Sequence, residues 1–166
     1  MSGKIGLGHL ETLVENLKRD LAMGGATLSG LNLPTIAAPT SATTTLTADD
    51  SGKVVLLAAN AAIVVLPTPV VGQNFKVVLA ADYATAASQI KTATTDGSVH
   101  FVGHSISAAS DDGNVSDNDS NDIISFGSAT VVGDTVDLVC ISSTQWLAVG
   151  TAQTGNTSNS IVFSDS

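Results

Sequence analysis

The sequence predicts a mainly β protein, an antiparallel sandwich or barrel of jelly-roll type, preceded by a short helix and an extended arm. From Thr43 onward, short runs of Val, Ile, Thr and Ala alternate with turn residues, as in half-buried strands. Helical spacing of apolar residues is confined to about residues 5–22. We therefore expect a helix within 1–24, an arm over 25–42 and a β domain over 43–166.

The first expected element is an amphipathic helix that ends at Gly24-Gly25. Its apolar residues follow a 4-3-4 spacing with one further leucine beside them: Leu10, Leu13, Val14, Leu17 and Leu21. This spacing gathers the apolar side chains on one helical face. That face would pack either on another protein or back onto the β domain, and the sequence leaves both open.

The second expected element is an uncharged arm. Residues 21–48 contain no charged side chain and are broken by Gly and Pro, which disfavours a helix. Apolar residues still recur at Leu28, Leu31, Leu33 and Ile36, which is unusual for a solvated linker. The pattern predicts an extended arm that buries these side chains against another protein.

The β domain is expected to consist of short strands separated by turn signals such as Asp50-Ser51-Gly52 and Gly133-Asp134. The candidate strands are Thr43–Thr47, Lys53–Ala58, Ala61–Leu66, Asn74–Ala80, Ser88–Lys91, Ser98–Val102, Ser105–Ala108, Ile123–Phe126, Thr135–Ile141, Gln145–Gly150 and Ser160–Phe163.

The charge of the chain argues against some partners. The net charge is −9, and residues 31–166 hold twelve acids against Lys53, Lys76 and Lys91. Such a domain is repelled by DNA and by anionic membrane surfaces, so neither is an expected partner. The chain shows no signal-peptide pattern, and its longest nearly apolar run, Val54–Leu66, is too short to cross a bilayer. We expect synthesis and assembly in a cytoplasm.

The candidate metal ligands lie in an Asp-rich segment and among the histidines. Residues 111–122 hold five carboxylates, and Asp117, Asp119 and Asn121 copy the start of an EF-hand loop. The copy fails where a Gly and a bidentate Glu are required, so a solvated surface loop is the favoured interpretation and a loose calcium site the alternative. His100 and His104 flank Gly103 and lack a further Cys or Glu ligand nearby. No metal site is expected.

No catalytic pattern stands out either. The chain has no Gly-x-Ser-x-Gly elbow, no phosphate-binding glycine loop and no Glu after Glu15, so we expect neither an enzyme nor a cofactor. The single cysteine, Cys140, is expected to be a small buried hydrophobe. Trp146 and Tyr83 are the only candidates for a carbohydrate platform, and a half-buried Trp146 is the favoured interpretation.

Several short motifs over about residues 43–151 resemble β domains of tailed-bacteriophage virion proteins. They are Asp50-Ser51-Gly52-Lys53, Leu66-Pro67, Gly72-Gln73-Asn74-Phe75, Gly133-Asp134 and the closing Trp146 to Gly150. Capsid decoration (cement) proteins and head fibres are the most similar families. The resemblance implies a subunit, commonly a homotrimer, on the outer surface of a capsid, with an N-terminal arm as its anchor.

The expected function is therefore a structural virion protein that binds the major capsid protein and stabilises the shell. The hypothesised anchoring residues are Leu10, Leu13, Val14, Leu17, Leu21, Leu28, Leu31, Leu33 and Ile36. The alternative is a receptor- or glycan-binding module of a phage head or tail fibre. A calcium-dependent bacterial surface module is a third possibility, resting on the Asp-rich segment alone.

Overall fold

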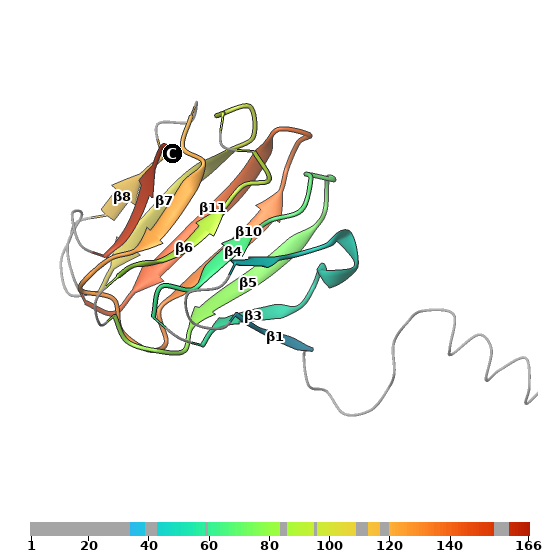
Figure 1. Ribbon diagram of the computed structural model, residues 1–166. Coiled ribbons are helices and arrows are strands. Elements are labelled where there is room, and N and C mark those ends of the chain that lie inside the picture. The colour runs from blue at the N-terminus through green and yellow to red at the C-terminus, as the bar shows by residue number, and fades with distance from the viewer. Residues whose placement is uncertain are drawn as a thin grey trace, which may run out of the picture. The chain divides into compact units, whose positions relative to one another are not determined.

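The computed structural model of the chain describes residues 34–38, 43–58, 60–83, 86–94, 96–108, 113–116, 120–154 and 160–166 (Figure 1). These residues belong to one compact unit that begins at Leu33. The predicted helix and most of the predicted arm lie outside the described residues. So do all hypothesised anchoring residues except Ile36.

Within the described residues, twelve strands form two sheets. The seven-stranded sheet has the order β1 (Thr35–Ala38), β3 (Val54–Leu57), β5 (Asn74–Leu79), β10 (Thr135–Cys140), β11 (Gln145–Ala152), β7 (His100–Ser107) and β8 (Gly113–Val115). The five-stranded sheet has the order β12 (Ile161–Ser164), β9 (Ile123–Phe126), β6 (Ser88–Lys91), β4 (Ile63–Val65) and β2 (Thr43–Thr45). A short 3-10 helix, Ala48–Asp50, precedes β3. The predicted mainly β sandwich is confirmed.

The first six strands wind back and forth between the two sheets. β1, β3 and β5 are parallel neighbours in one sheet, and β2, β4 and β6 are parallel neighbours in the other. Each parallel connection therefore runs through a strand of the opposite sheet, where α/β proteins use a helix. Among all strand pairs, five of ten are parallel. The expectation of a wholly antiparallel sandwich is corrected, because side-chain alternation reveals the buried face of a strand but not the direction of its neighbour.

The later strands extend both sheets from this winding. β10 pairs antiparallel with β5, and β9 pairs antiparallel with β6. β11 then lies between β10 and β7, antiparallel to the first and parallel to the second. Figure 1 shows these strands continuing the two layers.

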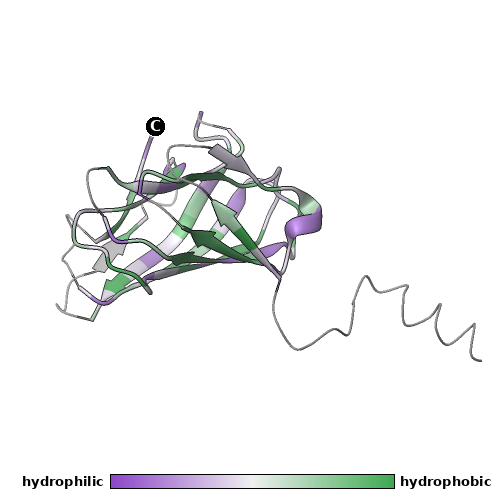
Figure 2. Cartoon of the chain, turned by 60° about the horizontal axis from the view of Figure 1, so that its bottom comes forward, coloured by the Kyte–Doolittle hydropathy of each residue, from purple (hydrophilic) through white to green (hydrophobic). Residues whose placement is uncertain are grey.

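The core fills the space between the sheets with alternating residues from both. Hydrophobic and hydrophilic residues alternate along several strands (Figure 2). On β10 and β11, Leu138, Cys140 and Ala148 are at most 1% exposed. Burial raises the pKa of the Cys140 thiol, and the prediction that Cys140 is a small buried hydrophobe is confirmed. Trp146 is 0% exposed and its ring centroid lies 5.8 Å from that of Phe75, so it is more deeply buried than predicted.

The β domain also begins before the predicted boundary at residue 43. β1 lies in the segment predicted to be an extended arm, yet it pairs with β3 from Thr35↔Val54 to Ala38↔Leu57. Ala38 is fully buried, and Ile36 packs partly buried against the core. Ile36 therefore contributes to the fold of the β domain and is not free to serve as an external anchor in the way that was expected.

One strand crosses a glycine that the sequence suggested was a break. β7 runs continuously through Gly103, where two strands, Ser98–Val102 and Ser105–Ala108, were predicted. Gly103 has φ +138°, and a Cβ at this position would collide with the backbone carbonyl of Ala148 on β11. Gly103 thus permits the close approach of β7 and β11 and does not end the strand.

The turn before β10 gives the first testable prediction. Asp134 is fully buried, and its carboxylate accepts hydrogen bonds from the backbone amides of Val131 (3.0 Å) and Gln153 (2.8 Å). Asp134→Ala leaves both amides without an acceptor, so the free energy of unfolding should fall by about 2–3 kcal/mol. Asp134→Asn keeps one acceptor oxygen and should lose less. Urea denaturation measures both, and equal losses in the two variants would contradict this role.

Candidate interaction surface

The side of the seven-stranded sheet that points away from the core is unusually apolar. We call its strand residues the outward face. Val139 on β10 lies directly opposite Leu147 on β11, and Leu147 lies opposite Val102 on β7. Val139, Leu147 and Ile106 are 41%, 38% and 53% exposed. A sheet with one face in water normally carries polar residues there, so this face is suited to contact with another surface.

The lysine and aspartate charges on the outward face also cancel one another. The face carries histidines in addition to these two residues. Within the described strands of this sheet, the charged side chains are Lys76 and Asp137. The Lys76 amine donates to both Asp137 carboxylate oxygens, at 3.0 and 3.2 Å. Their side chains are 46% and 56% exposed, so the pair adds little stability. Its effect on the surface is to cancel the two charges.

The described acids other than Asp137 all lie outside the strands. Asp49 and Asp50 belong to the 3-10 helix, and the others lie in connecting segments or at the C-terminus: Asp82, Asp96, Asp122, Asp134 and Asp165. On the five-stranded sheet, the one charged strand residue is Lys91. The negative charge of the described domain is thus concentrated in its connections, and the sheet faces stay nearly neutral.

A shallow hollow lies on the outward face. It has a volume of about 430 Å³ and is lined by β3, β5 and β10, including Val54, Asn74, Lys76 and Val139. The hollow is open, unlike the enclosed pockets that bury most of a small ligand. Its shape suits the side chains of a second protein surface.

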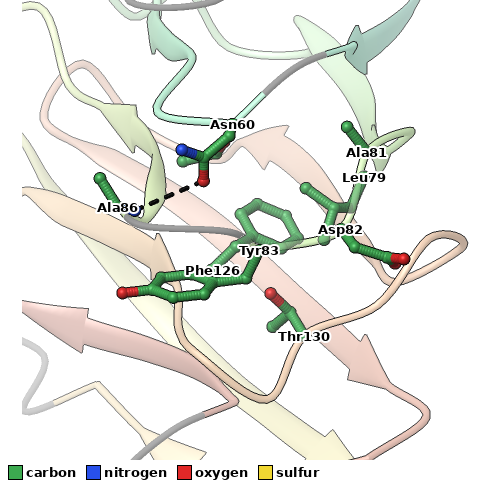
Figure 3. A pocket seen from close by; sticks show the side chains of 9 residues that line it. Asn60, Leu79, Ala81, Asp82, Tyr83, Ala86, Phe126 and Thr130 are labelled. Carbon is green, nitrogen blue, oxygen red and sulfur yellow. Dashed lines mark hydrogen bonds between the residues drawn. The ribbon is translucent and has the colours of Figure 1, made fainter.

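A second, smaller pocket is lined by residues of both sheets and of the connections between them. Leu79, Asp82, Tyr83, Phe126 and Thr130 converge around it (Figure 3), and it has no room for a water molecule. Asp82 there accepts a hydrogen bond from the Val132 amide at 2.8 Å. Trp146 is fully buried and offers no ring face to a sugar, whereas Tyr83 lines this small pocket and stays partly exposed.

The histidines lie on one face but do not converge. His100 and His104 both belong to the outward face of β7, and four residues of strand separate them by about 13 Å. The His100 ring nitrogens lie 3.3 Å from the Gly97 carbonyl and 3.2 Å from the Gln145 amide nitrogen. In the part of the chain that the structure describes, no three His, Cys, Asp or Glu side chains gather as a metal site would require.

The Asp-rich segment is described in part. Asp111, Asp112, Asp117 and Asp119 lie outside the described residues. The described part is not the solvated loop that was expected. Gly113–Val115 forms β8 beside β7, and the buried Ser116 hydroxyl donates to the Phe101 carbonyl at 2.6 Å. Local alternation could not reveal this strand, because no apolar run marks it.

The C-terminal end of the same segment is also held in the fold. Ser120 and Asn121 donate to the Asp165 carboxylate at 3.0 and 2.9 Å. Asp122 is 2% exposed, and its Oδ1 has no hydrogen-bond donor among the described residues. Asn121, a ligand in the partial EF-hand match, thus turns its amide nitrogen to a carboxylate.

The residues that carried the resemblance form turns and core. The Asp50 carboxylate accepts hydrogen bonds from the Thr47 amide and hydroxyl, both at 2.8 Å, and from the Lys53 amine at 2.6 Å. Gly52 has φ +83°, and the Ser51 hydroxyl accepts from the Asn74 amide at 3.1 Å. The motif Asp50 to Lys53 therefore fixes the turn into β3.

Comparisons with known proteins give no family for the chain. A scan against protein-family models finds no match, and a search of curated proteins finds none either. Within the described residues, no helix is both long and apolar enough to cross a membrane. The resemblance to phage virion proteins therefore rests on short motifs alone. In the structure, the residues of these motifs form turns and core.

The Asp50 turn predicts a pH dependence of stability. The Lys53 hydrogen bond, followed by that of the Thr47 amide, lowers the pKa of Asp50 from its ordinary 3.8 to about 2. Because the folded-state pKa is lowered, the stabilisation is complete above about pH 4 and is lost as the pH falls toward 2. With solvent screening, we expect a loss of about 1–2 kcal/mol over this range.

Urea denaturation between pH 2 and 6 checks this, with Asp50→Asn as the control. The control should be less stable at pH 6 and should lose less stability on acidification. Parallel pH profiles for the two proteins would show that Asp50 is not a source of the dependence.

Proposed function

We propose that the chain is a structural subunit of a virion, a capsid decoration (cement) protein that binds the outer capsid surface and stabilises the shell. The observation that carries the proposal is the apolar, neutral outward face on an otherwise acidic β domain. An exposed apolar face of this kind is typical of a protein that works in contact with other proteins. The motif resemblance to phage decoration and head-fibre proteins supplies the virion context.

The charge distribution supports the same assignment. The exposed acids of the connecting segments, Asp49, Asp82, Asp96 and Asp165, would face solvent and keep the domain away from DNA. The uncharged segment 21–48 can be buried against protein without removing charges from water. On the described strands of the outward face, the paired Lys76 and Asp137 are the charges that burial would remove from water. Both features fit a subunit that coats a shell from outside.

In the proposed mechanism, the N-terminal segment binds the major capsid protein. The proposed anchoring residues are Leu10, Leu13, Val14, Leu17, Leu21, Leu28, Leu31 and Leu33. Ile36 is left out because it packs on the core of the β domain. Since the protein would bind the assembled lattice and not free capsid subunits, each bound copy lowers the free energy of the closed shell by mass action.

A fibre module that binds a receptor or glycan remains the second candidate, from the same resemblance. It would need a specific exposed site, for which the two aromatic candidates were Trp146 and Tyr83. The first is fully buried, and the second is partly exposed beside a pocket that has no room for a water molecule. The decoration role is therefore better supported.

The arm gives the functional prediction. A chain that lacks residues 1–32 keeps β1 and should fold, whereas removal through residue 40 would delete β1 and damage the sheet. The shortened chain should no longer co-sediment with capsids that lack their own copy. Leu28→Ser with Leu31→Ser should weaken binding at least about tenfold, because each buried leucine contributes ~1.5–3 kcal/mol and ordering the arm offsets part of this.

The matched control replaces polar neighbours in the same segment, Thr27→Ala with Ser29→Ala, and should bind as the parent does. If the shortened chain binds as well as the parent, the capsid anchor lies in the β domain. Failure of the full chain to bind any such capsid would overturn the decoration role itself.

A further inference from the structure

The outward face leaves exposed aliphatic side chains at its centre and a paired charge beside them. Val139 and Leu147 lie opposite each other at the centre, and Lys76–Asp137 lies on the adjoining strands β5 and β10. We propose that this face is the contact surface between copies of this chain, centred on Val139 and Leu147. The proposal deepens the proposed function, since it assigns this face to self-association and leaves capsid binding to the N-terminal segment.

Electrostatics restricts the face through which a second copy can dock. Each copy carries a net charge of −9, so two copies repel one another at most orientations. The acids of the described residues lie in the connecting segments, apart from the paired Asp137. Copies that meet through the outward face keep these acidic segments away from the contact.

The ion pair makes the face complementary to itself. Lys76 and Asp137 stand side by side and remain about half exposed. When a two-fold axis brings the same face of two copies together, Lys76 of one copy can meet Asp137 of the other. A partner of a single charge sign would gain nothing from such a face, whereas an identical face matches it.

The size of the face is sufficient for a specific contact. Seven strands with a spacing of about 4.8 Å and a length of about 20 Å give a footprint of roughly 600 Å². A standard specific interface buries about 800 Å² on each partner, so the whole face would be used. The exposed Ile106 and Val115 belong to the face, and the exposed Ile141, just beyond β10, would extend the apolar contact.

The first test is the oligomeric state of the full chain by light scattering after gel filtration. The parent should be an oligomer at micromolar concentration. Val139→Lys with Leu147→Lys should weaken self-association at least about tenfold, because buried anchors dominate protein contacts. This variant reduces the net negative charge by two units, so greater repulsion between whole molecules cannot explain the loss.

The matched control is Val70→Lys with Val132→Lys. It makes the same charge change at two residues of connecting segments that are more exposed, at 59% and 52%. The control should remain oligomeric, and circular dichroism should show that both variants are folded. A monomeric parent, or a face variant that stays as oligomeric as the control, overturns the proposal.

A second test uses the exposed ion pair, whose replacement should not affect folding. Lys76→Glu makes the face negative and Asp137→Lys makes it positive, so each variant alone should associate at least about tenfold more weakly than the parent. An equimolar mixture should form mixed oligomers that neither forms alone. Absence of mixed oligomers overturns the proposal. If the parent is monomeric and the face variant loses only capsid binding, the occupant of the face is the capsid, and the decoration role survives.

Discussion

The fold depends on connections between the two sheets that aspartate side chains help to hold in place. Nine of the eleven connections between consecutive strands cross from one sheet to the other, β7–β8 and β10–β11 being the exceptions, so their backbone must be fixed by contacts of its own. Aspartate is short enough to accept hydrogen bonds from nearby backbone amides. Asp50 bonds the Thr47 amide, Asp96 the Ser98 amide, and Asp134 the Val131 amide. This use accounts for an acidic domain that contains no glutamate after Glu15.

The same constraint shapes the surface. Because the acids serve the turns, the described strands keep three charged residues, Lys76, Lys91 and Asp137, and the sheet faces stay nearly neutral. The inner faces form the core, while the outward face of the seven-stranded sheet exposes Val139 and Leu147 to contact. The charged residues thus lie mainly in the connections between strands, and the sheet faces remain available for assembly. The proposed function and the proposed self-association both rest on this distribution of charge.

Local sequence patterns predicted the strands well where side chains alternate and turns flank them. Ser88–Lys91 and Ile123–Phe126 have the expected bounds, and Asn74–Leu79 differs by one residue. β1 was missed because Thr-Ile-Ala-Ala shows neither alternation nor a turn signal, and β8 because the surrounding aspartates suggested a loop. Parallel winding could not be predicted, since it depends on contacts between strands distant in sequence. The aliphatic outward face was likewise invisible until the register of β10, β11 and β7 showed Val139, Leu147 and Val102 side by side.

The most direct test of the central claim, that the outward face is buried in the assembly, is lysine acetylation followed by mass spectrometry. Lys76 lies on the outward face and Lys91 on the five-stranded sheet, so one protein carries both probe and control. Labelling of Lys76 should fall several-fold between dilute protein and the assembled oligomer, while labelling of Lys91 stays constant. Equal labelling of Lys76 in both states, with the oligomer verified, would contradict it.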